Sequence, residues 1–165
     1  MKILLTGTSG QVGGELRRLL SVLGELIMPA RAELDLGKPE QIGAFLNQHR
    51  PDLIVNPAAL AAWCAANNVP LVHYSTDYVY GGRGVTPFDE HSACEPDNVY
   101  AQTKLAGEQA IAASACTHLI FRTSWVYGVR GKNFLNTMLA LAETKPQLGV
   151  VNDQIGAPTP ASMIA

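Results

Sequence analysis

The chain of 165 residues is poor in charge and in cysteine, and each shortage excludes a class of protein. Charged side chains make up 16% of the sequence, the formal net charge is −2, and lysine and arginine form no run. Because nucleic acids and anionic membranes are bound by basic patches, neither partner is expected. The three cysteines, Cys64, Cys94 and Cys116, include no Cys-x-x-Cys pair and predict free thiols rather than a disulfide framework or a zinc site.

Metal-ligand patterns and long apolar runs are also lacking. The four histidines show no ligand spacing on a shared helix face, so no metal site is predicted. The apolar run Ile3-Leu4-Leu5 stops at Thr6-Gly7, which is too short for a signal peptide or a membrane span, and a cytoplasmic protein is expected. The length and the 47% content of hydrophobic residues predict one domain over residues 1–165.

Short apolar runs alternate with helical stripes along the chain. Strands are expected at residues 2–6, 25–28, 53–55, 71–75 and 118–123. Helices are expected after the first strand, from Pro39 to Arg50, and near residues 60–68, 98–113 and 133–143. The first helix presents a stripe that extends to Leu23 and is predicted to be capped by Gly24. This alternation predicts an α/β fold, a Rossmann-like doubly wound parallel sheet with helices on both faces.

A glycine turn joins the first expected strand to the first helix. Gly7, Gly10 and Gly13 occupy a Gly-x-x-Gly-x-x-Gly spacing there. Glycines at such a turn let the backbone N–H groups approach a pyrophosphate, and Gly13 allows close packing one turn into the helix. The spacing differs from Gly-x-Gly-x-x-Gly, and a tight turn without a ligand is the alternative, but the flanking strand and helix favour a dinucleotide site.

The end of the second expected strand bears on the choice of cofactor. A carboxylate there binds the ribose diol of NAD, whereas a cation binds the 2′-phosphate of NADP. The stretch Pro29-Ala-Arg-Ala-Glu33 offers Arg31 and no acid at its first two positions. NADPH is therefore favoured, and NADH is the alternative. The alternative to a cofactor contact is that Arg31 is an ordinary exposed arginine on a loop.

Tyr100 and Lys104 stand four residues apart on an expected helix and so project from one face. An ammonium about 5 Å from a phenol, at an effective dielectric near 20, favours the phenolate by roughly 3 kcal/mol, which makes the phenol a better proton donor. Thr76 follows an apolar strand, at the sheet edge where open α/β sheets bind ligands. Alone, a Tyr-x-x-x-Lys pair is more often a core tyrosine beside a snorkelling lysine. Together with the glycine turn, it indicates hydride and proton transfer.

These motifs resemble the extended short-chain dehydrogenases/reductases and, within them, the dTDP-4-dehydrorhamnose reductases. The similarity runs through nearly the whole chain. It is carried by the blocks Gly7–Gly13, Glu33–Leu36, Arg50–Asn56, His73–Tyr80, Asn98–Glu108, Phe121–Tyr127, Asn133-Phe134 and Asn152–Thr159.

The resemblance implies reduction of the 4-keto group of dTDP-4-dehydro-L-rhamnose, a nucleotide sugar, to dTDP-L-rhamnose for bacterial surface polysaccharides. It implies that Tyr100 donates the proton, that Lys104 assists it and binds the nicotinamide ribose, and that Thr76 orients the carbonyl. The implied cofactor contacts are Gly7, Gly10, Gln11, Val12, Gly13, Asp35, Leu36, Pro57, Ala58, Ala59 and Tyr74. Arg31 joins them because of its positive charge after the second expected strand. Thr76, Asp77 and Trp125 are the implied substrate contacts, although a packed aromatic explains Trp125 equally well.

The sequence departs from the family in three places. Asn56-Pro57 replaces an Asn-Ala pair, and a proline removes a backbone donor. Residues 56–69 form a very short crossover between parallel strands, and the loop and helix that the family carries after this point are absent. The family's smaller C-terminal substrate domain is also expected to be missing, so that the sequence is interpreted as an incomplete record of a longer protein.

Two other functions remain open. A nucleotide-sugar epimerase or dehydratase of the same superfamily shares the turn and the Tyr100–Lys104 pair but retains NAD and needs further acid–base groups near Thr76. A non-catalytic NADP-binding regulatory subunit keeps the fold, yet has no need of all three catalytic residues. The sequence leaves the oligomeric state open, with a homodimer as one option.

Overall fold

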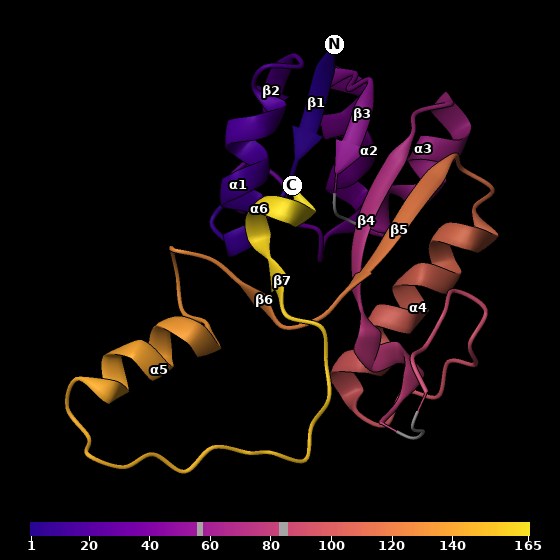
Figure 1. Cartoon of the computed structure of the whole chain (residues 1–165). Coiled ribbons are helices and arrows are strands. Elements are labelled where there is room, and N and C mark those ends of the chain that lie inside the picture. Colours follow the sequence, from indigo (N-terminus) through magenta and orange to yellow (C-terminus); the bar gives the residue numbers. More distant parts are fainter. Residues whose placement is uncertain (56–57, 83–85) are drawn as a thin grey trace.

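A computed structural model describes residues 1–55, 58–82 and 86–165. Its centre is a parallel five-stranded sheet with the strand order β2-β1-β3-β4-β5 (Figure 1). The strands are β1 (Lys2–Leu5), β2 (Glu25–Ile27), β3 (Leu53–Val55), β4 (Leu71–Thr76) and β5 (His118–Thr123). The predicted α/β, Rossmann-like class is confirmed.

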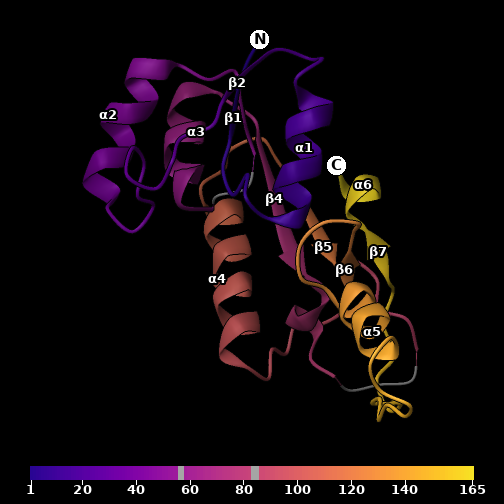
Figure 2. The same ribbon diagram turned by 90° about the vertical axis from the view of Figure 1, so that its left-hand side faces the viewer.

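Helices cover both faces of this sheet (Figure 2). One face carries α2 (Pro39–His49), α3 (Ala61–Asn67) and α4 (Val99–Ala113), and the other carries α1 (Gln11–Leu20) and α6 (Ala161–Ile164). Two apolar cores result, because successive side chains of a strand point to opposite faces. In β1, Leu4 packs into the core on the α2 side, whereas Ile3 and Leu5 pack with Leu16 of α1.

The region around Gly24 differs from the prediction. Helix α1 ends at Leu20 with Ser21 as its cap, and Leu23 lies beyond it with 57% of its surface exposed. Gly24 therefore does not cap the helix, and the apolar stripe does not reach Leu23. A side chain at Gly24 would place its Cβ 2.1 Å from the Met1 carbonyl oxygen, so glycine is needed there for a close approach to the start of β1.

The short crossover between β3 and β4 is closed by two small helical segments. They are the 3₁₀ helix η1 (Ala58–Leu60) and α3, whose C-cap Asn68 adopts a left-handed conformation with φ 53°. The two strands pair in parallel, with Ile54 opposite Leu71 and Val55 opposite Val72. A two-turn helix thus suffices to return the chain to the sheet. Asn56 and Pro57 lie outside the described residues.

The segment after β5 is less tightly packed. Strands β6 (Val126–Tyr127) and β7 (Thr159–Pro160) form a separate parallel pair, and between them α5 (Phe134–Ala142) has no fully buried residue (Figure 1). Within the three described ranges, no helix has both the length and the apolar character needed to cross a membrane. The cysteines are free thiols, as predicted, with Cys64 and Cys116 buried in the core.

Candidate active site and nucleotide-binding turn

The glycine turn leads from β1 into α1 and needs glycine at two positions for its own geometry. Gly7 has a φ of 68°, in the left-handed region that favours glycine. A Cβ at Gly13 would lie 2.1 Å from the Gly7 carbonyl oxygen and within 3 Å of two further backbone atoms. A Cβ at Gly10 would be in ordinary contact, 3.4 Å from the same oxygen. Gly7 and Gly10 are both exposed, and of the three glycines Gly10 is the one that the protein's own packing does not require.

The amino end of α1 presents backbone donors at this turn. Gly10 is its N-cap and carries no capping side chain, and no acidic residue stands in the first turn. The first bond of the helical ladder runs from the Gly14 N–H to the Gly10 carbonyl oxygen, 2.9 Å. The N–H groups of Gln11, Val12 and Gly13 precede that ladder, and together with the helix dipole they favour an anion.

Two side-chain amides tie a distant loop to the turn. Gln11 Nε2 donates to the Lys132 carbonyl oxygen (3.1 Å), and Asn133 Nδ2 donates to Gln11 Oε1 (3.0 Å) and to the Gly128 carbonyl oxygen (2.8 Å). Sequence reasoning placed Gln11 at the cofactor but missed this partner, because 122 positions separate it from Asn133. Val12, in contrast, packs into the core beside Leu16.

A groove of about 1050 Å³ opens beside α1 and the loop that these amides hold. Its wall includes Gly10 and Gln11 from the turn, four cationic residues (Arg17, Arg18, Arg130 and Lys132) and one acidic residue, Glu15, which pairs with Arg18 at 3.3 Å. The excess of positive charge and the helix N-terminus suit phosphate groups.

The residues expected around the adenosine end lie past β2, and those expected beside the nicotinamide lie at η1. Arg31 is exposed over 89% of its side chain, and its Nε lies 3.8 Å from Asp35 Oδ1, which also accepts a hydrogen bond from the Gly37 N–H (3.1 Å). An ion pair this exposed is weak, so the guanidinium is free to take another anion. Leu36 and Ala58 pack against the core, and Ala59 is exposed on η1. Pro57, the remaining expected contact here, lies outside the described residues.

Lys104 reaches from α4 to the middle of β4. Its Nζ donates to the Tyr74 carbonyl oxygen at 2.5 Å. Burial lowers the pKa of the Lys104 ammonium, and the negative charge of Glu108 acts against that shift. Tyr74 itself donates its hydroxyl to the Ile164 carbonyl oxygen (3.0 Å), and burial raises the pKa of its phenol. Lys104 therefore has one fixed position against the strand.

Tyr100 begins the same helix and remains open to solvent. Asn98 caps α4 by accepting a hydrogen bond from the Ala101 N–H (2.9 Å), which starts the helix immediately before the tyrosine. The Tyr100 ring is 57% exposed and packs edge-on against Tyr78 of the 3₁₀ helix η2 (Asp77–Tyr80), with the ring centres 6.4 Å apart. Its exposure leaves room for a ligand beside the phenol.

Thr76 ends β4 at the edge where the sheet meets η2. Its hydroxyl is nearly buried, accepts from the Tyr78 N–H (3.2 Å) and donates to Asp77 Oδ1 (3.3 Å). The second bond is longer than the usual range for two oxygens, so the hydroxyl can turn to another acceptor at small cost. Asp77 is held by Ser124, whose hydroxyl donates to Asp77 Oδ2 at 2.5 Å.

Trp125 lies next to Ser124 and adopts a left-handed backbone, with φ 41°. Its ring is 43% exposed, and it lies so close to Gly156 that a Cβ there would be 2.6 Å from the ring. A non-glycine residue at positive φ stores backbone strain, which is common at ligand sites. Gly156 covers one side of the ring, so Trp125 is also in part a packed aromatic residue, which was the alternative to a substrate contact.

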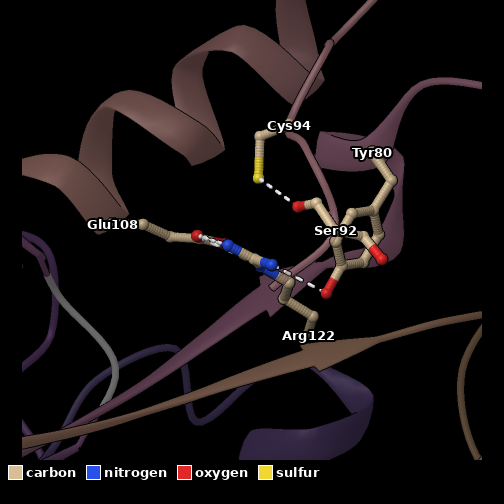
Figure 3. A network of polar contacts seen from close by, with 5 residues as sticks. All are labelled: Tyr80, Ser92, Cys94, Glu108 and Arg122. Atoms are coloured by element: carbon tan, nitrogen blue, oxygen red, sulfur yellow. Dashed lines mark hydrogen bonds and ion pairs between the residues drawn. The ribbon is translucent and has the colours of Figure 1, made fainter. Parts of the chain in front are cut away.

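A buried ion pair behind Lys104 was not anticipated from the sequence. Arg122 of β5 binds the carboxylate of Glu108, one helical turn after Lys104, and also reaches Tyr80 (Figure 3). Two signals point to it: Glu108 follows Lys104 at the helical spacing, and Arg122 interrupts an otherwise apolar strand.

The structure brings Thr76, Tyr100 and Lys104 to β4 and the helical segments beside it, with Gly7–Gly13 at the carboxyl end of β1 in the same sheet.

Comparison with known proteins identifies the relatives of this arrangement. The family described as the RmlD substrate binding domain matches residues 1–63 and 56–165. A dTDP-4-dehydrorhamnose reductase of Shigella flexneri is 46% identical over 193 residues, an alignment that takes in all of this chain and 64% of the relative. The chain thus spans less than two thirds of the length of that relative.

Solved structures show the same similarity. The crystal structure of a dTDP-4-dehydrorhamnose reductase from Clostridium acetobutylicum superposes with a TM-score of 0.92 at 33% identity, over 98% of this chain and 66% of that one. A dTDP-4-dehydrorhamnose reductase from Bacillus anthracis in complex with NADP superposes with a TM-score of 0.90 at 29% identity, with the same shares covered. The fold is therefore one that holds NADP in a relative.

Proposed function

Because this chain belongs to the RmlD substrate binding domain family, we propose that it reduces the 4-keto group of dTDP-4-dehydro-L-rhamnose with NADPH, giving dTDP-L-rhamnose. The observation that supports this most is the anchoring of Lys104 on the Tyr74 carbonyl oxygen, one helical turn from the exposed Tyr100 and beside the strand that ends in Thr76. The named relatives supply the substrate class.

The residues present fit a dinucleotide. The N–H groups of Gln11 and Val12, which lie before the first hydrogen bond of the helix, suit a pyrophosphate. Gly10 is exposed, and a side chain there would project where the phosphates approach. The exposed guanidinium of Arg31 suits a 2′-phosphate and favours NADPH over NADH. Arg31 stands near Asp35, whose carboxylate is the position expected to face the adenosine.

When bound, the reduced nicotinamide supplies the hydride. Tyr100 then donates its phenolic proton to the oxygen that was the ketone, and the Lys104 ammonium stabilises the phenolate left behind. Thr76 orients the carbonyl by turning its hydroxyl away from the long contact with Asp77. Asp77 and Trp125 are proposed to hold the sugar nucleotide, and Tyr74, Ala58 and Ala59 to line the cofactor. These roles need Lys104 to remain charged, and the Tyr74 carbonyl oxygen favours the ammonium.

Net consumption of NADPH tests the proposal against its alternatives. Purified protein with dTDP-4-dehydro-L-rhamnose should oxidise one NADPH for each dTDP-L-rhamnose formed, as followed by absorbance and by chromatography of the nucleotide sugars. An epimerase or dehydratase would change the sugar without net loss of NADPH. A regulatory subunit would bind NADPH without turnover. Either of these two outcomes would contradict the proposed reduction.

We also propose that a segment carried by relatives is missing after Ala59. The two overlapping matches of the family, at residues 1–63 and 56–165, support this, as does the alignment of 165 residues over 193. Sequencing of the gene together with the intact mass of the purified protein tests it, and a mass equal to that of the printed sequence would contradict it.

A cytoplasmic location is proposed as well. Cys64 and Cys116 lie in one buried cluster as free thiols, and burial, with the proximity of Cys116, raises the pKa of the Cys64 thiol to about 12. Neighbouring thiols that remain reduced are typical of a reducing compartment. Cell fractionation with detection of the native protein tests this, and recovery outside the cytoplasm would contradict it.

A further inference from the structure

The carboxylate of Glu108 is enclosed by one arginine directly behind the lysine of the candidate site. Glu108 has 5% of its surface exposed. Its two oxygens accept three hydrogen bonds in all from Arg122: from Nε at 3.1 Å and 3.2 Å, and from Nη2 at 2.6 Å (Figure 3). Such a forked pairing fixes the position of both groups, because the planar guanidinium matches the carboxylate in one geometry.

Arg122 is held from the other side as well. Its Nη1 donates to the Tyr80 hydroxyl at 2.7 Å, and the Tyr80 ring stacks on Phe88 with the ring centres 4.8 Å apart. In the sheet, Arg122 of β5 lies opposite Ser75 of β4. Ser75 is the neighbour of Tyr74, whose carbonyl oxygen accepts from Lys104. The ion pair and the lysine anchor therefore lie at the same level of the sheet.

Stability alone is a weak reason for this pair. Removing two charges from water costs about as much as their attraction returns, so that apolar residues of similar size would often serve as well. Loss of one partner is different, because it leaves the other charge buried and uncompensated. Loss of Glu108 would also remove from Lys104 the negative charge that acts against the lowering of its pKa by burial.

We propose that Glu108 and Arg122 are positioning residues for the Tyr100–Lys104 site: Arg122 holds Glu108 in one geometry, and Glu108 fixes the turn of α4 behind Lys104 and places its negative charge near the ammonium. This inference rests on the proposed function only in the use made of Lys104. Its test reads the lysine directly and needs no turnover.

The charge of the pair that acts on Lys104 is that of Glu108. Burial lowers the pKa of Lys104, and the charge of Glu108 opposes that shift. Burial raises the pKa of Glu108, but the hydrogen bonds from Arg122 and the nearby charge of His73 lower it overall. The titratable and charged side chains on β4, β5 and η2 nearest this part of α4 are His73, Tyr74, Asp77, Tyr78, Tyr80 and Arg122. Only Glu108 and Arg122 are changed in the experiment below.

The experiment is a titration of the Lys104 side chain by nuclear magnetic resonance of its Cε carbon. Lys104→Met assigns the signal. Glu108→Gln should lower the pKa of Lys104 by about one unit, because the carboxylate charge that favours the ammonium is removed. Arg122→Met should raise it by about the same amount, because the Glu108 charge is left without its partner. The double variant Glu108→Gln/Arg122→Met also lacks the carboxylate and should match Glu108→Gln to within about 0.3 units.

A purely structural role gives a different pattern. Damage to packing moves both single variants in the same direction and moves the double variant further, and that result would overturn the proposal. Glu40→Gln, at the exposed start of α2, is the matched control and should leave the titration unchanged. Should Glu108→Gln fail to fold, Arg122→Met alone still decides: a rise in the pKa of Lys104 supports the proposal, and no shift or a fall would contradict it.

The two proposals fail separately. If the titrations follow the expected pattern and wild-type protein consumes no NADPH, the positioning inference stands and the proposed reaction is wrong. If NADPH is consumed and the titrations do not follow the pattern, the reverse holds.

Discussion

Replacement of Gly13 by alanine tests how closely the glycine turn is built. The new Cβ would lie 2.1 Å from the Gly7 carbonyl oxygen, 2.8 Å from the Gly7 carbonyl carbon and 2.9 Å from the Thr8 Cα. All three are backbone atoms, so no side-chain rotation relieves the contact, and the turn must shift by about 1 Å to reach an ordinary separation. Overpacking of this kind costs about 1–3 kcal/mol.

Two effects are therefore expected for Gly13→Ala. Alanine gains up to about 1 kcal/mol over glycine in a helix, so the net loss in the free energy of unfolding should be about 1–2 kcal/mol by urea denaturation. The displaced N–H groups should also weaken NADPH binding about tenfold or more, since hydrogen bonds to a charged group contribute about 1.5–3 kcal/mol. Quenching of tryptophan fluorescence by NADPH measures this affinity.

Gly14→Ala and Gly43→Ala are the matched controls. Both positions lie in helices, and a Cβ at either meets nothing within 4 Å. Each should stabilise the protein slightly through helix propensity, and Gly43→Ala, on the opposite face of the sheet, should bind NADPH as the wild type does. If Gly13→Ala were as stable as these controls and bound NADPH equally well, the account of the turn would be refuted.

Three further predictions concern other parts of the site. Arg31→Ala should weaken NADPH binding about tenfold and leave NADH binding unchanged in fluorescence titrations, because the exposed guanidinium is available to the 2′-phosphate; equal losses for both cofactors would contradict this. Asn133→Ala should lower the unfolding free energy by about 1–2 kcal/mol in urea, because it removes the cap of α5 and the link to Gln11, whereas the exposed Asn152→Ala should not. The pKa of Glu108 is lowered in the folded protein, so its contribution to stability is present above the unfolded value near 4.3 and is lost as pH falls through the folded value. The stability difference between wild type and Glu108→Gln should accordingly be smaller at pH 3 than at pH 7, and a constant difference would argue against the shift.

The sheet was predictable from the sequence because local patterns specify it. Each strand of the sheet is an apolar run bounded by glycine, proline or polar residues, and the strands need helices between them to be parallel. The end of α1 was not predictable in the same way. Leu23 continues the helical spacing, but the approach of Gly24 to the Met1 backbone ends the helix earlier, and that is a contact between distant segments.

The same distinction between local patterns and contacts of distant segments applies to the candidate site. Residues joined by a short motif, such as Tyr100 with Lys104 or Gly7 with Gly13, could be predicted together because helix and turn geometry relate them directly. The partners of these residues could not be predicted. Lys104 meets the Tyr74 carbonyl, Gln11 meets Asn133, and Asp77 meets Ser124 through tertiary packing, which leaves no periodic signal in the sequence.

The chemistry assigned to this fold depends on the phenol of Tyr100. Tyr100→Phe removes only the hydroxyl from a ring that is 57% exposed, so the unfolding free energy should stay within about 0.5 kcal/mol of the wild type. NADPH should bind with the same affinity, and the rate of NADPH oxidation with dTDP-4-dehydro-L-rhamnose should fall by about two orders of magnitude or more, as for the loss of a general acid. A variant that binds NADPH and turns over at the wild-type rate would contradict the account.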